Sequence, residues 1–297
     1  MATLLRFNDP DRGARVGVQI ANTIYDVTDK FPTVAAWLRA SVGRPQAAIE
    51  DIDILARNAK HAYLSSVVDA PPIPNLATLI SPVDSQDVWA TGVTYERARD
   101  ARMEETKAGA DLYERIHVAQ RPELFFKSPA KRVVAPYGRV GVLKDSHSTV
   151  PEPELALLIN PAMEVVGYGI GIDMTARDVE ADNPLYLPQA KFYNGSCALG
   201  PGFVLGKLRT FPKVTIRMSI MRGPEFIFEG EASTDQIKRD LPNLIDYLGR
   251  LGVFEEGVVL LTGNGIIPPP DFHLRVGDVI RISMDNVGTL TTTAMVV

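Results

Sequence analysis

From residue 76 to the C-terminus, the chain is mainly a succession of short segments rich in branched and aromatic residues, bounded by Gly, Pro and Asn. Such segments are typical of β-strands. Examples are "LISPV", "VWATGV", "ELFFK", "KVTIRMSIMRG" and "VVLLTGNG". Helical segments do not alternate with them regularly, which argues against a doubly wound parallel sheet. We therefore predict an α+β fold that is rich in strands.

The first part of the chain has a different pattern. Residues 1–30 contain short strand-like segments separated by turn residues, and residues 32–68 carry helical patterns. The segment "DAPPIPN", residues 69–75, follows, and its three prolines favour an extended connector. We therefore predict a small N-terminal α/β domain over residues 1–75 and a larger domain over residues 76–297.

Two later segments have helical patterns. Residues 95–119, "YERARDARMEETKAGADLYERIHVA", form a charged stretch whose polar faces and Gly109 suit a lid that becomes ordered when substrate binds. The segment "PNLIDYLGRLG" begins with Pro242 and ends near Gly249 or Gly252, which are helix start and stop signals.

Charge and cysteine content exclude several classes of function. The formal net charge of −5 does not favour nucleic acid or an anionic membrane as a partner. No apolar run approaches the length of a membrane span, and the N-terminus lacks the apolar run of a signal peptide. The single cysteine, Cys197, excludes an intrachain disulfide and a multi-cysteine zinc site. We expect a cytoplasmic protein, with no nucleic-acid or membrane partner.

The segment "PEPELALLIN", residues 151–160, places two glutamates just before an apolar run. Side chains at i and i+2 of a strand share a face, so Glu152 and Glu154 would project together and repel each other unless a cation lay between them. "GYGIGIDMTARD" ends a further apolar strand near Asp173, which a neighbouring strand could bring beside them. Oxygen ligands of this kind suit Mg²⁺, Mn²⁺ or Ca²⁺. The alternative is an exposed strand end without a metal.

Five ordered stretches together resemble motifs of the fumarylacetoacetate hydrolase family. They are "PEPELALLI", "GYGIGIDMTARD", "KFYNGSCALGPGFV", "VVLLTGNG" and "LRVGDVIRISMDNVGTLTTTAMVV". The resemblance runs from about residue 80 to the C-terminus. It implies a mixed β-roll catalytic domain, a small N-terminal domain and a homodimer or homotetramer. It also implies that Glu152, Glu154 and Asp173 bind Mg²⁺, with Mn²⁺ or Ca²⁺ as alternatives.

The carbon–carbon hydrolases of this family carry a His and a Glu that activate water, in a motif like G-x-N-Y-x-x-H-x-x-E. The matching segment here is "GVTYERARDARMEE", in which Ala98 and Ala101 stand at those two positions. Neither alanine can accept a proton, so this dyad is absent. Of the four histidines, His147 merits attention because it lies five residues before Glu152.

One branch of the family lacks that histidine, the 2-keto-3-deoxy-D-arabinonate dehydratases. This sequence is most similar to that branch, especially through the run "NPLYLPQ" ahead of Lys191. The resemblance implies a dehydratase that takes a 2-keto acid as its small-molecule substrate. A divalent cation would polarise the 2-keto group and stabilise an enolate, hydroxide would leave from C4, and the product would be 2-oxoglutarate semialdehyde.

The resemblance also implies roles for individual residues. Glu123, in "RPELFFK", would be the acid/base glutamate, and Lys191 would be the active-site lysine, acting without a covalent bond or as an imine. Their alternatives are structural ion pairs, with Arg121 or Lys127 for Glu123 and with Asp173 or Asp178 for Lys191. The expected substrate-binding residues are Lys127, Gln189, Thr262 and Tyr95. Asn264 departs from the family, which has threonine there, and Cys197 is expected to be a small buried residue.

Other readings of the same site remain open. The chain could be a hydrolase or decarboxylase of a diketo acid, an isomerase, or a non-catalytic protein that keeps the metal site. The sequence leaves the substrate's stereochemistry and chain length, the native metal and the oligomeric state undetermined.

Overall fold

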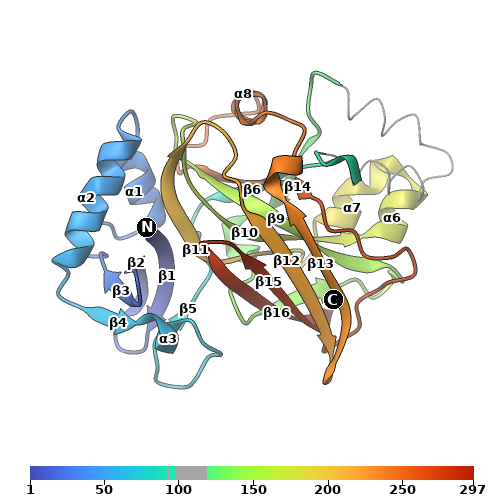
Figure 1. Cartoon of the computed structure of the whole chain (residues 1–297), viewed down its shortest axis with the longest axis horizontal. Helices are drawn as coiled ribbons and strands as arrows, with labels where there is room; N and C mark the ends of the chain where they lie inside the picture. Colours follow the sequence, from blue (N-terminus) through green and yellow to red (C-terminus); the bar gives the residue numbers. More distant parts are fainter. Residues whose placement is uncertain (93, 98–118) are drawn as a thin grey trace.

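The computed structural model describes residues 1–92, 94–97 and 119–297, and within these residues the chain forms two β-sheets flanked by short helices (Figure 1). The strand-rich α+β fold expected from the sequence is confirmed. Most of the lid expected over residues 95–119 lies outside the described residues.

The larger sheet combines strands from the first and the second half of the chain. Its strands are β1 (Ala2–Asp9), β2 (Gly13–Ile20), β3 (Thr23–Asp26), β4 (Ala62–Leu64), β5 (Thr78–Leu79), β6 (Asp87–Thr91), β7 (Leu124–Ser128), β9 (Thr149–Ile159), β10 (Val165–Ala176), β11 (Cys197–Leu208) and β14 (Val258–Asn264). They are ordered β4-β3-β2-β1-β11-β10-β9-β14-β6-β7, and β5 pairs with β1.

The smaller sheet belongs to the second half of the chain. It contains β8 (Arg139–Val142), β12 (Thr215–Arg222), β13 (Glu225–Ser233), β15 (Val279–Met284) and β16 (Gly288–Val296), in the order β13-β12-β15-β16-β8. Both sheets are mixed, because β14 pairs in parallel with β6 and β16 pairs in parallel with β8.

Short helices lie between the strands. The α-helices are α1 (Val34–Ala40), α2 (Pro45–Arg57), α3 (Ser65–Val68), α6 (Arg177–Asp182), α7 (Leu187–Lys191) and α8 (Leu241–Gly249), and the 3₁₀-helices are η1 (Ala130–Arg132), η2 (Pro184–Tyr186) and η3 (Thr234–Gln236). The helix expected to begin at Pro242 is confirmed as α8. Among the described residues, every helix is too short or too polar to cross a bilayer.

Strand β9 lies at the centre of the molecule, and both of its faces are buried. Its odd-numbered apolar residues, such as Leu155 and Leu157, belong to one core cluster, while Ala156 and Leu158 belong to another. A strand that is buried on both faces is expected to have an unbroken run of apolar residues, and "LALLI" is such a run. Glu152 and Glu154 lie on the same face of β9 as Ala156 and Leu158, so two carboxylates are buried when this strand folds.

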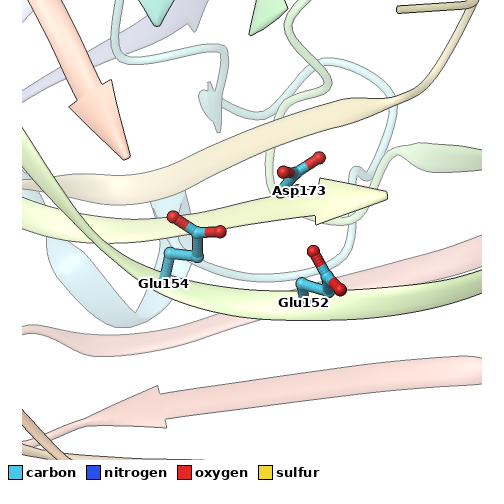
Figure 2. A group of neighbouring side chains, drawn as sticks. All are labelled: Glu152, Glu154 and Asp173. Atoms are coloured by element: carbon cyan, nitrogen blue, oxygen red, sulfur yellow. The ribbon is translucent and has the colours of Figure 1, made fainter. Parts of the chain in front are cut away.

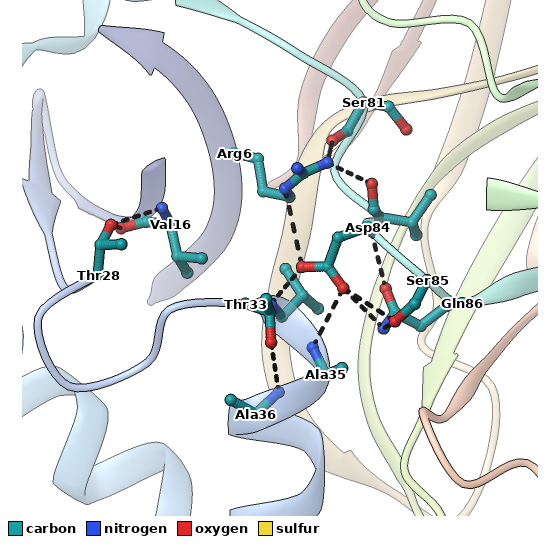
Figure 3. A network of polar contacts seen from close by, with 12 residues as sticks. Arg6, Val16, Thr28, Thr33, Ala35, Ala36, Ser81, Asp84, Ser85 and Gln86 are labelled. Atoms are coloured by element: carbon teal, nitrogen blue, oxygen red, sulfur yellow. Dashed lines mark hydrogen bonds and ion pairs between the residues drawn. The ribbon is translucent and has the colours of Figure 1, made fainter. Parts of the chain in front are cut away.

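The N-terminal strands continue the larger sheet, because β1 pairs antiparallel with β2 on one side and with β11 on the other. Side chains reinforce this junction (Figure 3). Arg6 on β1 donates to the carbonyls of Ser81 and Val83 at 3.0 and 2.5 Å. Asp84 accepts the Val34 N–H at the start of α1 at 2.5 Å, which satisfies an otherwise unpaired helix donor. The division into domains at residue 75 stays a prediction.

Candidate active site and metal centre

Three carboxylates meet because β9 and β10 are antiparallel neighbours. Asp173 is directly opposite Glu152, and Gly171 is opposite Glu154. Residues paired across an antiparallel ladder share a face, so all three side chains project to the same side (Figure 2). One oxygen from each of Glu152, Glu154 and Asp173 lies within 4.8 Å of the others, and all three residues are buried.

Glu154 is the member of this triad with the least compensation for its charge. In the part of the chain that the structure describes, its carboxylate accepts one hydrogen bond, from the backbone N–H of Gly263, at 2.5 Å. Burial, followed by the neighbouring carboxylates of Asp173 and Glu152, raises the pKa of Glu154 well above its usual value. An ionised carboxylate in this position needs a nearby cation, because burial without a partner is costly.

Lys191, at the C-terminal end of α7, supplies part of the compensation. Its ammonium donates to Glu152 Oε2 at 2.6 Å, to Asp173 Oδ2 at 2.9 Å and to the hydroxyl of Thr175 at 2.7 Å. The structure therefore brings Lys191 to the carboxylates, as expected. Of the two ion pairs considered as alternatives, the one with Asp173 is present, and it lies inside the candidate site.

Lys127 also contacts one of these carboxylates, that of Asp173. Its side chain is completely buried, and its ammonium lies 2.5 Å from Asp173 Oδ1. It also donates to the backbone carbonyls of Met174, at 3.0 Å, and Lys191. The sequence suggested a substrate contact for Lys127, but the structure surrounds its ammonium with protein acceptors.

Thr262 likewise has protein partners. It is buried in β14, and its hydroxyl donates to the carbonyl of Leu155 at 3.0 Å. The β9–β14 pairing shifts register between Leu261 and Asn264, and Gly263 there has φ +91, a conformation that favours glycine. This irregularity turns the Gly263 N–H toward Glu154. Asn264, the departure from the family pattern, bonds through its side chain to the backbone of Ile266.

Tyr95 lies close to the triad. It is 2 % exposed, and its hydroxyl has no hydrogen-bond partner among the described residues. Burial, followed by the charges of Glu154 and Asp235, raises the pKa of the phenol, so it stays protonated and can donate. A buried hydroxyl without a protein partner is available to a ligand.

Glu123 precedes β7, and its carboxylate lies against Gly92, which follows β6. A Cβ atom on Gly92 would collide with Glu123 Oε2, so the carboxylate occupies space that exists because residue 92 is glycine. Glu123 is partly exposed, unlike the triad. A carboxyl group that is partly desolvated and reachable from solvent suits an acid or a base.

Three other residues discussed from the sequence differ in exposure and position. Gln189 is exposed on α7, two residues from the buried Lys191, and side chains at i and i+2 do not face the same side of a helix. The His147 side chain is 88 % exposed and pairs with Asp178 at 2.9 Å. Cys197 is opposite Asp173 in the β10–β11 pairing, and burial raises the pKa of its thiol to about 12, which favours the protonated thiol near neutral pH.

Sequence reasoning missed the residues that support the site. Thr175, the Gly263 N–H and Gly92 were not identified as candidates. Thr175 could have been found, because it follows Asp173 by two residues in a strand and therefore shares its face. The roles of Gly263 and Gly92 depend on a β-irregularity and a strand pairing that the sequence does not encode locally.

The donor set fits a hard divalent cation. Glu152, Glu154 and Asp173 offer carboxylate oxygens, and Lys127 and Lys191 provide two positive charges against three negative ones. Three carboxylates with positions left for water or substrate are typical of Mg²⁺ sites.

Comparisons with known proteins identify a family model and several similar proteins. Residues 87–295 match the family model described as "Fumarylacetoacetate (FAA) hydrolase C-terminal". The chain is 39% identical over 218 residues to the 2-dehydro-3-deoxy-D-arabinonate dehydratase of Saccharolobus solfataricus, covering 72% of this chain and 73% of that protein. It is 36% identical over 281 residues to a probable 2-keto-3-deoxyxylonate dehydratase of Haloferax volcanii, covering 91% of each.

A solved structure has the same fold. It is a 2-keto-3-deoxy-D-arabinonate dehydratase complexed with magnesium and 2,5-dioxopentanoate, with a TM-score of 0.81 and 30% sequence identity. The match covers 100% of this chain and 99% of that one. The whole length of the chain, including its N-terminal strands, therefore has a counterpart in that protein.

Proposed function

The chain belongs to the fumarylacetoacetate hydrolase family, and we propose that it is a divalent-metal-dependent dehydratase of a 2-keto-3-deoxy-pentonate. The product would be 2-oxoglutarate semialdehyde, also called 2,5-dioxopentanoate. The observation that carries the proposal is the buried triad of Glu152, Glu154 and Asp173, in a chain similar over most of its length to dehydratases of these acids.

The triad would hold Mg²⁺, with Mn²⁺ or Ca²⁺ as alternatives. When bound, such a cation polarises the 2-keto group and makes the protons at C3 more acidic. The carboxylate and 2-keto oxygens of the substrate can both approach a cation that keeps positions free from the protein. Glu152, Glu154 and Asp173 would hold that cation, and the C1–C2 end of the substrate would then lie beside β9 and β10.

Lys191 would bind the same end of the substrate. Its three N–H donors go to Glu152, Asp173 and the hydroxyl of Thr175, so a substrate oxygen that accepts a hydrogen bond from Lys191 would take the place of one of these acceptors. Two carboxylate partners favour the charged ammonium, which is not a nucleophile. We therefore propose a non-covalent role for Lys191 and not an imine. The Tyr95 hydroxyl is a further donor to the substrate, and Gln189 stays a predicted contact.

Glu123 would move the protons of the elimination. It takes a proton from C3 and returns it to the C4 hydroxyl, which leaves as water. A further proton shift from C5 to C3 produces an enol at C4–C5, which becomes the aldehyde. No water nucleophile is required, so Ala98 and Ala101, which stand where hydrolases of the family carry His and Glu, do not prevent this reaction.

The test is incubation of the purified protein with 2-keto-3-deoxypentonates and Mg²⁺, with and without EDTA. We expect 2-oxoglutarate semialdehyde, detected by mass spectrometry or by a coupled aldehyde dehydrogenase, and its loss in EDTA. Parallel samples would contain acylpyruvate and oxaloacetate. Cleavage of a carbon–carbon bond, or product formation that persists in excess EDTA, would contradict the proposal. The cytoplasmic location and a homodimer or homotetramer stay predictions.

A further inference from the structure

Lys127 is a buried cation with an unusually complete set of partners. Its side chain has no exposed surface, and it is among the largest fully buried side chains of the described residues. A buried ammonium is tolerated when its charge is paired and its donors are used. The charge of Lys127 is paired with the Asp173 carboxylate, and its ammonium donates hydrogen bonds to two backbone carbonyls.

These contacts join three separate elements. Lys127 lies on β7, Asp173 and Met174 lie on β10, and the carbonyl of Lys191 ends α7. The two oxygens of Asp173 are divided between the lysines, with Lys127 at Oδ1 and Lys191 at Oδ2. A carboxylate held at both oxygens has a fixed orientation, and Lys127 holds the oxygen that Lys191 does not.

The contact of Lys127 with the backbone carbonyl of Lys191 also affects the position of the Lys191 side chain. By donating to the carbonyl of Lys191, Lys127 fixes the end of α7, from which the Lys191 side chain reaches Glu152 and Asp173. Helix α7 spans only Leu187–Lys191, so its own hydrogen bonds do little to hold its end in place.

We propose that Lys127 is a positioning residue that orients both Asp173 and Lys191, and that it makes no contact with the substrate. Groups that orient a metal ligand affect metal affinity or activity by about 10- to 100-fold. The proposal deepens the proposed function and rests on it for the activity measurement, whereas the metal-binding measurement is independent of the substrate.

The variant Lys127→Met tests this, because methionine keeps an unbranched side chain and removes the ammonium. We expect a folded protein that binds one Mn²⁺ per chain with an affinity lowered about tenfold or more, as measured by electron paramagnetic resonance without substrate. With substrate, kcat should fall about a hundredfold while KM changes little, because no direct contact is lost. The control is Lys131→Met, since Lys131 is exposed in the nearby η1 and should leave both quantities unchanged.

Other results would overturn the proposal. A large rise in KM with kcat unchanged would mean that Lys127 binds substrate, and a loss of thermal stability with unchanged Mn²⁺ affinity and kcat would mean that its role is structural. If the variant does not fold, a crystal structure of the wild-type protein with Mg²⁺ and 2-oxobutanoate would show whether Lys127 contacts the ligand. The Lys127 ammonium should contact Asp173 and the two carbonyls, and a hydrogen bond to the ligand would contradict the proposal. Failure of the proposed function would instead appear as wild-type protein without turnover, with the Mn²⁺ comparison unaffected.

Discussion

Two buried acidic groups of the larger sheet have opposite surroundings, one on β3 near the edge of the sheet and the other on β9 in its interior. Asp26 on β3 pairs with Arg12 at 3.0 Å and Arg15 at 2.8 Å and accepts a hydrogen bond from the backbone of Thr28. Burial opposes its ionisation, but these hydrogen bonds and charges outweigh it, and the pKa of Asp26 is lowered. Among the described residues, Glu154 accepts one hydrogen bond, from a backbone N–H, and burial, followed by its two carboxylate neighbours, raises its pKa.

The difference distinguishes a structural cluster from the candidate metal centre. The protein itself satisfies Asp26, so that cluster contributes to stability without any ligand. Among the described residues, the triad around Glu154 lacks such compensation, and the proposed dication would supply it. Such an arrangement costs stability in the metal-free protein and gains binding energy for the cation, as expected of a functional site.

The largest effect should follow from Glu154→Gln. Without this carboxylate the triad loses a ligand, so kcat should fall more than about a hundredfold. The free energy of unfolding of the metal-free variant should rise, because a poorly compensated buried charge is removed. Mg²⁺ at a hundred times its Kd should stabilise the wild type by about 2.7 kcal/mol and leave the variant unaffected. Urea denaturation in EDTA measures the stability of the metal-free protein, and denaturation in Mg²⁺ measures the stabilisation by the cation. A variant less stable than the wild type in EDTA would contradict the contrast between Glu154 and Asp26.

Glu123 should behave as a carboxylate independent of the triad. In Gly92→Ala, the added methyl group would displace the Glu123 carboxylate, and displacement of a catalytic group by about 1 Å can cost about 100-fold in rate. Mn²⁺ affinity should not change, because the triad is untouched. The matched control is Gly206→Ala, where the nearest atom to a Cβ would lie 4.0 Å away. Equal loss of Mn²⁺ binding and activity in the first variant would show that the two parts of the site are coupled.

Asp26→Asn should produce the reverse pattern. Loss of the charge leaves Arg12 and Arg15 without their buried partner, at a cost of about 1–3 kcal/mol in the free energy of unfolding. Mn²⁺ affinity and kcat should match the wild type. Asp29→Asn serves as the control, since the Asp29 side chain is 76% exposed and its ion pair with Arg15 is long. A changed Mn²⁺ affinity in Asp26→Asn would contradict the separation of the two clusters.

The sequence predicted the strand-rich fold and the meeting of three carboxylates because both depend on local pattern. Parity along one strand places Glu152 and Glu154 on one face, and a Gly-rich apolar strand ending at Asp173 is a natural partner. The sequence could not reveal that Lys127 is buried behind Asp173, because that depends on β7 and α7 meeting across the molecule. In isolation, "ELFFK" is equally compatible with an exposed lysine at a strand end.

Long-range pairing also explains where the local prediction of the N-terminal part was wrong. A helical pattern was expected as far as residue 68, but α2 ends at Arg57, and Ala62–Leu64 form β4. Strand β4 forms because it pairs with β3. Its three residues are too few to give a strand pattern in the sequence that could be recognised beside the neighbouring helical segments. The pairing of β1 with β11, which joins the two parts of the sheet, likewise links residues about two hundred positions apart.

The smallest expected effect is a pH dependence that belongs to Asp26 alone. Because its pKa in the folded protein is below the unfolded value near 3.8, its stabilising contribution is present above that value and is lost as the pH falls through the folded pKa. The stability difference between wild type and Asp26→Asn should therefore be constant near neutral pH and shrink below about pH 4. Urea denaturation of both proteins in EDTA across this range measures it. Comparing the two proteins cancels the contributions of the titrating groups that they share. A stability difference that grows on acidification would show that folding disfavours the ionised form of Asp26, as it does for Glu154.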